Sequence, residues 1–307
     1  MGEFDVITRY FSSLGSGEYV DLSVGDDGAA LTVPPNSELI VSTDSSVLDT
    51  HFTDDLFPED LGYKAVASAA SDLAAMGAEP LGMTLALTVP SVDDLWLHGL
   101  SQGLTRACHE YRLPLVGGDT TRGPLSLTLT VMGFCPRNQK LLRSGAQVGD
   151  RICVSGYLGD AAFGLAVMQG KYRGLEIDFE DQEYLVSRFT HPTARVDLGC
   201  RMRKLATSCI DLSDGLLQDA GHVTHASGVR FSIQSGAVPL SSALISAVGE
   251  AQALEFALNG GEDYELLFTL PPETDVPDEL TVIGTVEAGE GVHCDVMSRG
   301  QGYDHFH

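Results

Sequence analysis

Seven short segments of the chain set an aspartate beside glycine, serine or threonine at points where a strand or a helix is expected to end. They are residues 25–28, 42–44, 71–72, 117–121, 159–160, 210–215 and 260–263. A strand end directs its last side chain into a crevice, and a small neighbouring residue leaves room for a ligand there. Carboxylates gathered in this way repel one another unless cations lie between them. The pattern therefore predicts loops that hold Mg²⁺ and a nucleotide, because Mg²⁺ takes its ligands from one or two carboxylates and from bound phosphates.

The first half of the chain alternates expected strands with expected helices. Residues 38–42 form an apolar strand that should end at Thr43 and Asp44, and residues 60–76 form an alanine-rich helix that Gly77 should end. Ser91, with Asp94 three residues later, resembles a capping box at the start of the next helix. Residues 125–131 alternate apolar with polar side chains, as a half-buried strand does. The apolar face of the helix after Ser91 repeats at Val92, Trp96, Leu100, Leu104, Cys108 and Tyr111.

The second half restarts with an expected strand at residues 152–154, followed by a glycine-rich turn and a helix that ends near Gly170. Residues 195–205 and 216–227 predict helices, the second closed by Gly228, and residues 208–210, 264–270 and 281–286 predict strands. Residues 136–149 are polar and basic and contain no acidic residue. We therefore expect an α/β (α+β) chain of two domains, residues 1–136 and 150–307, joined by a connector at residues 137–149.

Charge and cysteine usage limit the partners and the compartment. The chain has 18 Lys and Arg against 43 Asp and Glu, a formal net charge of −25, which disfavours nucleic acid and anionic membranes. No apolar stretch is long enough to span a membrane, and the charged first ten residues do not resemble a signal peptide. The six cysteines form no Cys-x-x-Cys pair, so neither a zinc site nor a disulfide framework is expected, and Cys153 and Cys209 are predicted to be buried. These features indicate a cytoplasmic protein.

Several common catalytic motifs are absent from the sequence, which contains no P-loop, protein-kinase, Gly-x-Ser-x-Gly or His-Glu-x-x-His motif. Each candidate residue also has a purely structural alternative when it is taken alone. Asp44 can be an ordinary turn residue, Asp72 a solvent-facing carboxylate, Asp214 a helix N-cap and His51 a structural histidine. Asp211, at the expected end of a strand, is harder to explain structurally.

Taken in order, the seven segments resemble the thiamine-monophosphate kinase family. This family belongs to an ATP-binding superfamily that includes aminoimidazole ribonucleotide synthetase, selenophosphate synthetase and a hydrogenase-maturation enzyme. The resemblance covers nearly the whole chain and is most specific at residues 71–78, 117–124, 210–216 and 260–266. It implies an aminoimidazole ribonucleotide synthetase-like fold, with an N-terminal ATP-binding domain that pairs in a homodimer, a C-terminal α/β domain, and ATP in the cleft.

The same resemblance implies a set of site residues. It implies that Mg²⁺ is bound by Asp27, Ser42, Thr43, Asp44, Asp72, Asp119, Asp211 and Asp214. It implies ATP contacts from Gly118, Asp119, Arg143 and Ser213, and contacts with the thiamine moiety from His51, Glu262 and Tyr303. Catalysis would then depend on Asp44, Asp72, Asp119 and Arg143.

The implied reaction is ATP-dependent phosphorylation of thiamine monophosphate to thiamine diphosphate by direct in-line transfer. The acceptor phosphate is already mostly dianionic at neutral pH, so no strong general base is needed. The main barrier is the electrostatic repulsion between ATP and the acceptor phosphate, which are both polyanions. Mg²⁺ and Arg143 would reduce this repulsion.

Two alternatives remain open from the sequence. One is another reaction of the superfamily. A selenophosphate synthetase should carry a reactive cysteine near its N-terminus, whereas the first cysteine here is Cys108, and the hydrogenase-maturation enzyme should end in cysteine rather than in His307. The other is a non-catalytic sensor of nucleotide or divalent cation. The near-complete set of acidic metal-ligand candidates argues against this loss of catalysis.

Overall fold

The computed structural model of the chain describes residues 2–296. The chain divides into two compact units, Met1–Lys140 and Leu141–His307. This division falls within residues 137–149, the stretch that the sequence predicts as a connector. Lys140, in that stretch, pairs with Glu38 of the first unit at 3.1 Å between Nζ and Oε2. Among the described residues, no helix is long and apolar enough to cross a bilayer.

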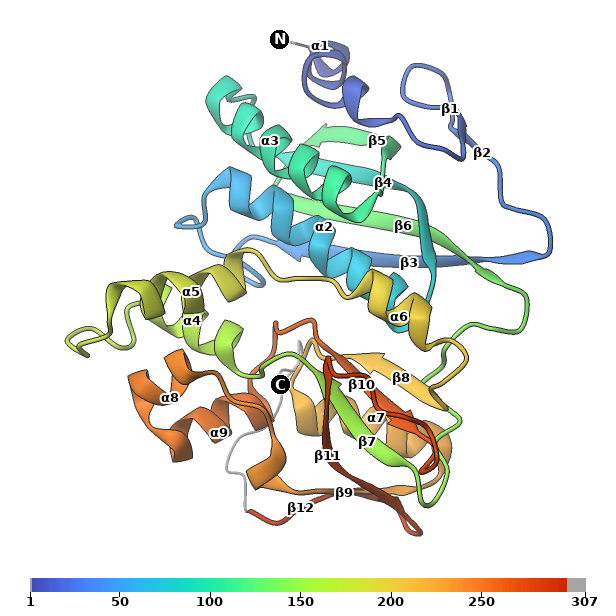
Figure 1. The fold of residues 1–307 in the computed structure, drawn as a ribbon. Helices are drawn as coiled ribbons and strands as arrows, with labels where there is room; N and C mark the ends of the chain where they lie inside the picture. The colour runs from blue at the N-terminus through green and yellow to red at the C-terminus, as the bar shows by residue number, and fades with distance from the viewer. Residues whose placement is uncertain (1, 297–307) are drawn as a thin grey trace. The chain divides into compact units, whose positions relative to one another are not determined.

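The first unit is built on a four-stranded sheet (Figure 1). Its strands, in spatial order, are β3 (Ser37–Val47), β6 (Ser126–Pro136), β4 (Glu79–Val89) and β5 (Leu115–Arg122). β4 and β5 are parallel, and the other neighbours are antiparallel. Two helices, α2 (Pro58–Ala75) and α3 (Asp94–Tyr111), lie side by side against one face of the sheet (Figure 1). Short elements precede β3: α1 (Glu3–Val6), η1 (Ile7–Phe11), η2 (Ser12–Leu14), β1 (Val20–Leu22) and β2 (Ala30–Leu31).

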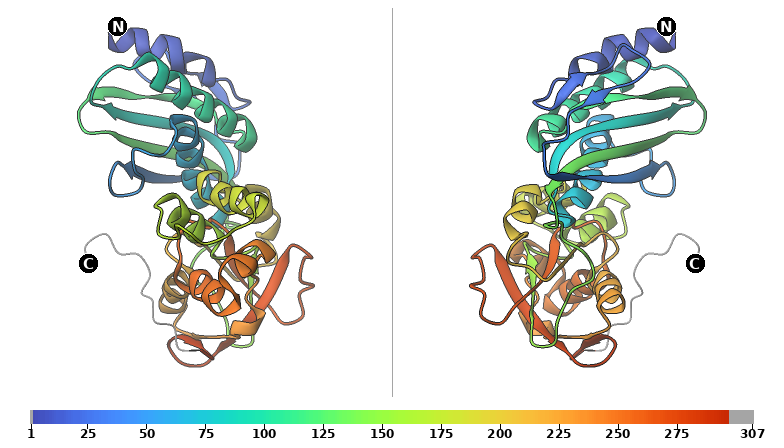
Figure 2. Two further views of the ribbon diagram at one scale, coloured as in Figure 1. Left: turned by 90° about the vertical axis from the view of Figure 1, so that its left-hand side faces the viewer. Right: turned by 90° about the vertical axis from the view of Figure 1, so that its right-hand side faces the viewer.

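Helix α2 forms and ends as its sequence predicts. Its many alanines are buried and present little bulk, so the helix packs closely on the sheet and on α3. At its C-terminus Gly77 adopts a φ of 62°, and the Ala78 amide donates to the Leu73 carbonyl at 2.7 Å. This is the glycine-dependent end that the sequence indicates. The N-terminal helical segment, blue in Figure 2, lies beside α3, where the Tyr10 hydroxyl donates to Asp94 at 3.2 Å.

The start of α3 differs from the prediction. Asp93, rather than Ser91, is the N-cap, because its carboxylate accepts from the Leu95 and Trp96 amides at 2.9 Å each. Val92 consequently lies before the helix and is 47% exposed. The later positions of the predicted apolar face, Leu100, Leu104 and Tyr111, are buried. The capping box on Ser91 is therefore wrong, whereas the periodicity of the helix is largely right.

Strand β3 is longer than its apolar residues predict. It continues through Thr43 and Asp44 to Val47, so Asp44 lies inside the strand and pairs with Leu129 of β6. The polar residues remain in the strand because β6 supplies partners for them. The hydroxyls of Thr43 and Thr130 lie 2.9 Å apart. The predicted strand end at Thr43 and Asp44 is therefore wrong, whereas the alternating burial predicted for β6 is confirmed.

The second unit contains a six-stranded sheet with helices packed on it (Figure 1). In spatial order its strands are β12 (Gly291–Cys294), β9 (Arg230–Ile233), β11 (Leu280–Glu287), β7 (Arg151–Ser155), β10 (Leu266–Leu270) and β8 (Ser208–Asp211). Its helices are α4 (Asp160–Met168), α5 (Phe179–Thr190), α6 (Val196–Met202), α7 (Leu216–Ser227), α8 (Ser242–Val248) and α9 (Glu250–Asn259), with a short turn η3 (Ser235–Ala237). α6 is shorter than the predicted helix at residues 195–205.

The strand predicted at residues 264–270 is β10, which begins at Leu266 and is buried on both faces. It lies between β7 and β8, and its one polar residue, Thr269, is satisfied by the Ser208 hydroxyl at 2.6 Å. A central strand covered on both sides needs no solvent-facing residues. Cys153 and Cys209, on β7 and β8, are 0% and 2% exposed, which confirms that they are core residues.

Candidate functional site

A cavity of about 730 Å³ in the first unit brings together three of the predicted site residues. One wall is the loop at residues 25–29, which carries Asp27, and another is the start of β5 with Gly118 and Asp119. The N-terminal helical segment, including Phe4 and Phe11, supplies apolar side chains. A mostly apolar cavity with a few converging polar groups is the usual form of a small-molecule site.

Gly118 lies in β5 with a φ of 151°, a conformation that favours glycine. A Cβ atom at this position would lie 1.9 Å from the backbone oxygen of Leu85, so no side chain fits. The absence of a side chain lets β5 pack closely on β4, and the β5 backbone at Gly117 and Gly118 forms part of the cavity wall.

Gly118→Ala is expected to reduce ATP use severely, because the added methyl group displaces β5 from β4 at the cavity wall. The expected loss in kcat/KM for ATP is roughly 100-fold, the scale of a misplaced reacting group. Steady-state kinetics with varied ATP measures it. Gly236→Ala is the matched control, because a Cβ at that position meets nothing within 4 Å. Near-normal ATP kinetics in a folded Gly118→Ala variant would contradict the role of this wall.

A second group of predicted residues joins β3 to α2. The Ser42 hydroxyl on β3 donates to the Asp72 carboxylate on α2 at 2.5 Å. The Ser42 side chain therefore lies on the face of the sheet that α2 covers. Asp44, two residues after Ser42, lies on the same face of β3. Asp72 is half-buried in the last turn of α2, where the helix dipole disfavours a negative charge. A cation near this pair would remove that penalty.

The two groups in the first unit do not form one cluster. β6 and β4 separate β3 from β5, three strand spacings of about 4.8 Å each, or about 14 Å in total. The register also aligns Asp119 with Ala86, Thr128 and Ser45, which lie on the face opposite Asp44. Within residues 2–296 no group of three or more His, Cys, Asp or Glu side chains is placed to hold a metal ion by itself.

The donor chemistry nevertheless fits Mg²⁺. The residues offered are carboxylates and hydroxyls, and Mg²⁺ is usually bound by one or two carboxylates together with substrate phosphates rather than by an all-protein cage. Asp27 and Asp119 line a cavity with an open backbone wall, and Asp44 lies beside the Ser42–Asp72 pair. Each group could therefore hold a metal whose remaining ligands come from the nucleotide and water.

In the second unit, hydrogen bonds join the segment after β8 to the segment before β10. Together these two segments carry four more of the predicted residues. Asp211 ends β8, and Ser213 and Asp214 follow it before α7. The Glu262 amide donates to the Ser213 carbonyl at 2.8 Å, which places Glu262 beside the segment 211–214. A Cβ on Gly261 would lie 2.3 Å from that same carbonyl, so the close approach of the loops requires glycine.

Glu262 is held in an unfavourable backbone conformation. Its φ is 72°, and Tyr264 has a φ of 51°, both unusual for residues other than glycine. The Tyr264 hydroxyl donates to the Glu262 carboxylate at 3.2 Å. The surrounding hydrogen bonds fix the direction of this carboxylate, as is common for a residue that contacts a ligand.

Two buried aspartates that support these loops were not among the predicted site residues. Asp219 accepts from the Asp214 and Gly215 amides at 3.0 and 3.1 Å, so Asp214 is not itself the N-cap of α7. Burial raises the pKa of Asp219 to about 7, against the lowering effect of these amides. Asp263 accepts from the Gly159 amide at 2.7 Å, and burial raises its pKa to about 8. The sequence did not indicate the contact of Asp263, because the Gly159 amide is more than a hundred residues away in the chain.

Asp160, from the seventh of the aspartate segments, has a structural role. It is fully buried, and its two carboxylate oxygens accept from the Tyr184 and Ser241 hydroxyls at 2.7 and 2.6 Å. The Tyr184 and Ser241 hydroxyls belong to the neighbouring helices α5 and α8, so Asp160 joins three helices of the second unit.

Three predicted residues remain: Arg143, His51 and Tyr303. Arg143 is exposed in the second unit, and its backbone carbonyl accepts from the Ser227 hydroxyl at 3.2 Å. The Nδ1 atom of His51 accepts from the Val47 amide at 3.1 Å, a contact that closes the turn after β3. Tyr303 lies outside the described residues.

Known proteins resemble this chain over nearly its whole length. Residues 25–135 match the family described as AIR synthase related protein, N-terminal domain. The chain is 44% identical to the thiamine-monophosphate kinase of Salmonella typhimurium, over 99% of this chain and 98% of that protein. The structure is similar to thiamine-monophosphate kinase from Stenotrophomonas maltophilia, with a TM-score of 0.84 and 40% identity over 93% of each chain. It is also similar to AaThiL complexed with AMPPCP and TMP, with a TM-score of 0.83 and 34% identity over 99% of this chain and 97% of that one.

These likenesses confirm the predicted α/β fold of the aminoimidazole ribonucleotide synthetase-like kind and the resemblance drawn from the four most specific motifs. The identity and coverage are high enough to decide the family. The chain belongs to the family of thiamine-monophosphate kinases.

Proposed function

We propose that the chain transfers the γ-phosphate of ATP to thiamine monophosphate, giving thiamine diphosphate and ADP. The observation that carries this proposal is the likeness, over nearly the whole chain, to a protein solved with an ATP analogue and thiamine monophosphate. The cavity with the open β5 backbone at Gly118 supports it, because it suits a phosphate compound.

In this proposal the first unit binds the nucleotide phosphates. Gly118, where a side chain would push β5 away from β4, is proposed to offer backbone contacts, and Asp119 and Asp27 line the same cavity. A second, separate group on β3 and α2 is assigned to metal binding as well: Ser42, Thr43, Asp44 and Asp72. Mg²⁺ bound by these oxygens would neutralise the phosphates and align them for in-line attack. The acceptor needs no strong base, since a phosphate monoester is mostly dianionic at neutral pH.

The second unit is assigned the remaining contacts. Asp211 and Asp214 are metal-ligand candidates, and Ser213 is an ATP-contact candidate on the same loop surface. Glu262, whose carboxylate accepts from the Tyr264 hydroxyl, is proposed to balance the positive charge of the thiazolium or to accept from the aminopyrimidine. His51 and Tyr303 complete the proposed thiamine contacts.

Arg143 is proposed to steady the phosphates of ATP, because a planar guanidinium donates paired hydrogen bonds to phosphate. Arg143→Ala is therefore expected to lower kcat/KM for ATP by roughly 100-fold while changing the KM for thiamine monophosphate far less. The control is Arg173→Ala, another exposed arginine of the second unit. Equal losses toward both substrates would count against an ATP-specific role.

We also propose that the chain acts as a homodimer. Leu39 and Val41 alternate with Ser42 on β3 and lie on the sheet face away from α2. They are 49% and 54% exposed. Neighbouring exposed aliphatic side chains are typical of a protein–protein interface, and a second copy of the chain would bury them. Light scattering during size-exclusion chromatography tests this, and a monomer at micromolar concentration would contradict it.

A cytoplasmic location fits the same proposal. All six cysteines are free thiols, which suits a reducing compartment that also supplies ATP. Fractionation of cells that produce the protein tests this location, and recovery of the protein outside the cytoplasmic fraction would contradict it.

The reaction is tested by product analysis. Purified protein with ATP and Mg²⁺ is given thiamine monophosphate, free thiamine or an aminoimidazole precursor, and nucleotides and thiamine esters are separated by chromatography. The proposal predicts thiamine diphosphate and ADP with thiamine monophosphate alone. ADP formation only with an aminoimidazole precursor would instead assign the chain another reaction of the superfamily.

A further inference from the structure

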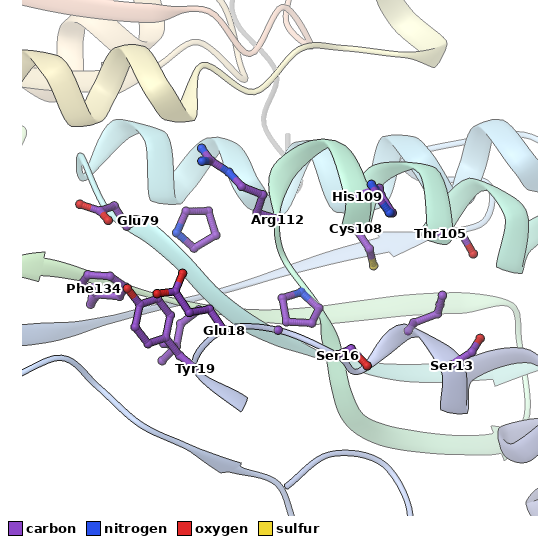
Figure 3. Close-up of a pocket in the computed structure, with 15 residues that line it drawn as sticks. Ser13, Ser16, Glu18, Tyr19, Glu79, Thr105, Cys108, His109, Arg112 and Phe134 are labelled. Carbon is purple, nitrogen blue, oxygen red and sulfur yellow. The ribbon is translucent and has the colours of Figure 1, made fainter. Parts of the chain in front are cut away.

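A second cavity, of about 530 Å³, lies in the first unit at the end of the sheet where β4 begins (Figure 3). It shares no lining residue with the cavity that contains Gly118. Its walls come from the segment after η2, from the start of β4, and from the last turns of α3. No role proposed above uses any of these residues.

One side of this cavity is aromatic and acidic. The rings of Tyr19 and Phe134 meet edge to face, with centroids 5.2 Å apart and an interplanar angle of 78°. Glu79 pairs with Phe134 across β4 and β6, and Glu18 precedes Tyr19 in the chain. Figure 3 shows both carboxylates around these rings.

The electrostatic environment of Tyr19 agrees with this arrangement. Its pKa is raised, first by desolvation of the ring and then by the negative charges of Glu18 and Glu79. Desolvation disfavours a charge of either sign, but the negative charges of Glu18 and Glu79, which also disfavour a phenolate, favour a cation at this position. The aromatic face adds to this preference, because a ring attracts a cation placed over it.

The other side of the cavity is the C-terminal end of α3. Carbonyl groups at a helix C-terminus carry partial negative charge, which also favours a cation. Arg112 at the C-cap carries the one permanent positive charge among the lining side chains, against the two carboxylates. The balance of charge therefore favours a cationic ligand over a phosphorylated one.

We propose that this cavity is a second ligand site, which binds an organic cation with aromatic rings, of the unphosphorylated thiamine type, between Tyr19, Glu18 and Glu79. The choice of thiamine among aromatic cations rests on the proposed function, since the substrate of a thiamine-monophosphate kinase is an ester of thiamine. The cavity volume lies in the range of small-molecule sites. Phosphate esters of thiamine bind this site more weakly, because their negative charge faces the two carboxylates.

The test is a calorimetric titration of the whole protein with thiamine, in the presence of saturating AMPPCP and thiamine monophosphate, so that the transfer site is filled. We expect one further equivalent of thiamine to bind. Glu18→Gln with Glu79→Gln should weaken this binding roughly tenfold, as should Tyr19→Ala, whereas Tyr19→Phe keeps it. The matched control is Glu287→Gln with Glu290→Gln, which removes two exposed carboxylates of the second unit.

Two further readouts keep the outcome clear. Hydrogen exchange on the unmodified protein should slow in residues 13–19 and 105–113 when thiamine is added. Turnover of thiamine monophosphate, measured on the same preparations, reports separately on the proposed function and should not change in the Glu18 and Glu79 variants. Absence of thiamine binding, no change of binding in those variants, or equally tight binding of thiamine monophosphate at this site overturns the proposal.

Discussion

Asp44→Asn is expected to abolish phosphoryl transfer while leaving the fold intact. Asparagine keeps the volume of the side chain and the oxygen that accepts from the Ser45 amide, a contact of 2.8 Å. It removes the negative charge beside the Ser42–Asp72 pair, which the proposed metal site requires. We expect kcat to fall by roughly 100- to 1,000-fold, the scale of losing one electrostatic contact to a transition state.

Initial rates at limiting Mg²⁺, with circular dichroism to check folding, measure this effect. Asp55→Asn is the matched control, because Asp55 is exposed in the same unit and has no proposed role. Asp119→Asn should show a comparable loss, since Asp119 lines the cavity with Gly118. Near-normal rates in both Asp44→Asn and Asp119→Asn at limiting Mg²⁺ would rule out the proposed metal sites.

Glu265→Ala should cause the largest loss of stability in the second unit. Glu265 is fully buried, and its carboxylate accepts from Arg188 at 2.9 Å, from Arg195 at 2.6 and 2.7 Å and from Ser155 at 2.5 Å. Removing the carboxylate leaves two arginines without their acidic partner in a largely buried place. The expected cost is about 3–5 kcal/mol, the usual result of breaking a buried ion pair.

Urea unfolding followed by circular dichroism measures the change in the free energy of unfolding. Glu279→Ala is the control, because its pair with Arg201 at 2.8 Å is more than half exposed on both sides. An exposed pair of this kind contributes about 0–1 kcal/mol. Equal unfolding midpoints for the two variants would show that the buried ion group does not stabilise the unit.

Features that depend on residues close together in the sequence could be predicted. The end of α2 at Gly77 follows from one glycine, and the half-buried β6 follows from its alternating residues. Strand β3 could not be bounded in this way. Its polar second half remains a strand only because Thr130 and its neighbours on β6, more than eighty positions away in the chain, pair with it.

The same distinction holds for the site. The sequence motifs identified the segments that carry the candidate residues, because small residues beside aspartate are typical of one chemistry. They did not show that Asp44 and Asp119 lie on different strands and on opposite faces of one sheet. Nor could they show that Asp263 accepts from the Gly159 amide, a contact across more than a hundred residues.

The central claim is direct transfer of the γ-phosphate from ATP to the phosphate of thiamine monophosphate. Its most direct test is a single-turnover reaction with ATP labelled in the γ-phosphate, Mg²⁺ and thiamine monophosphate, followed by separation of the products. We expect the label to appear in the terminal phosphate of thiamine diphosphate, in an amount equal to the ADP formed. Label released only as inorganic phosphate, with no labelled thiamine diphosphate, would contradict it.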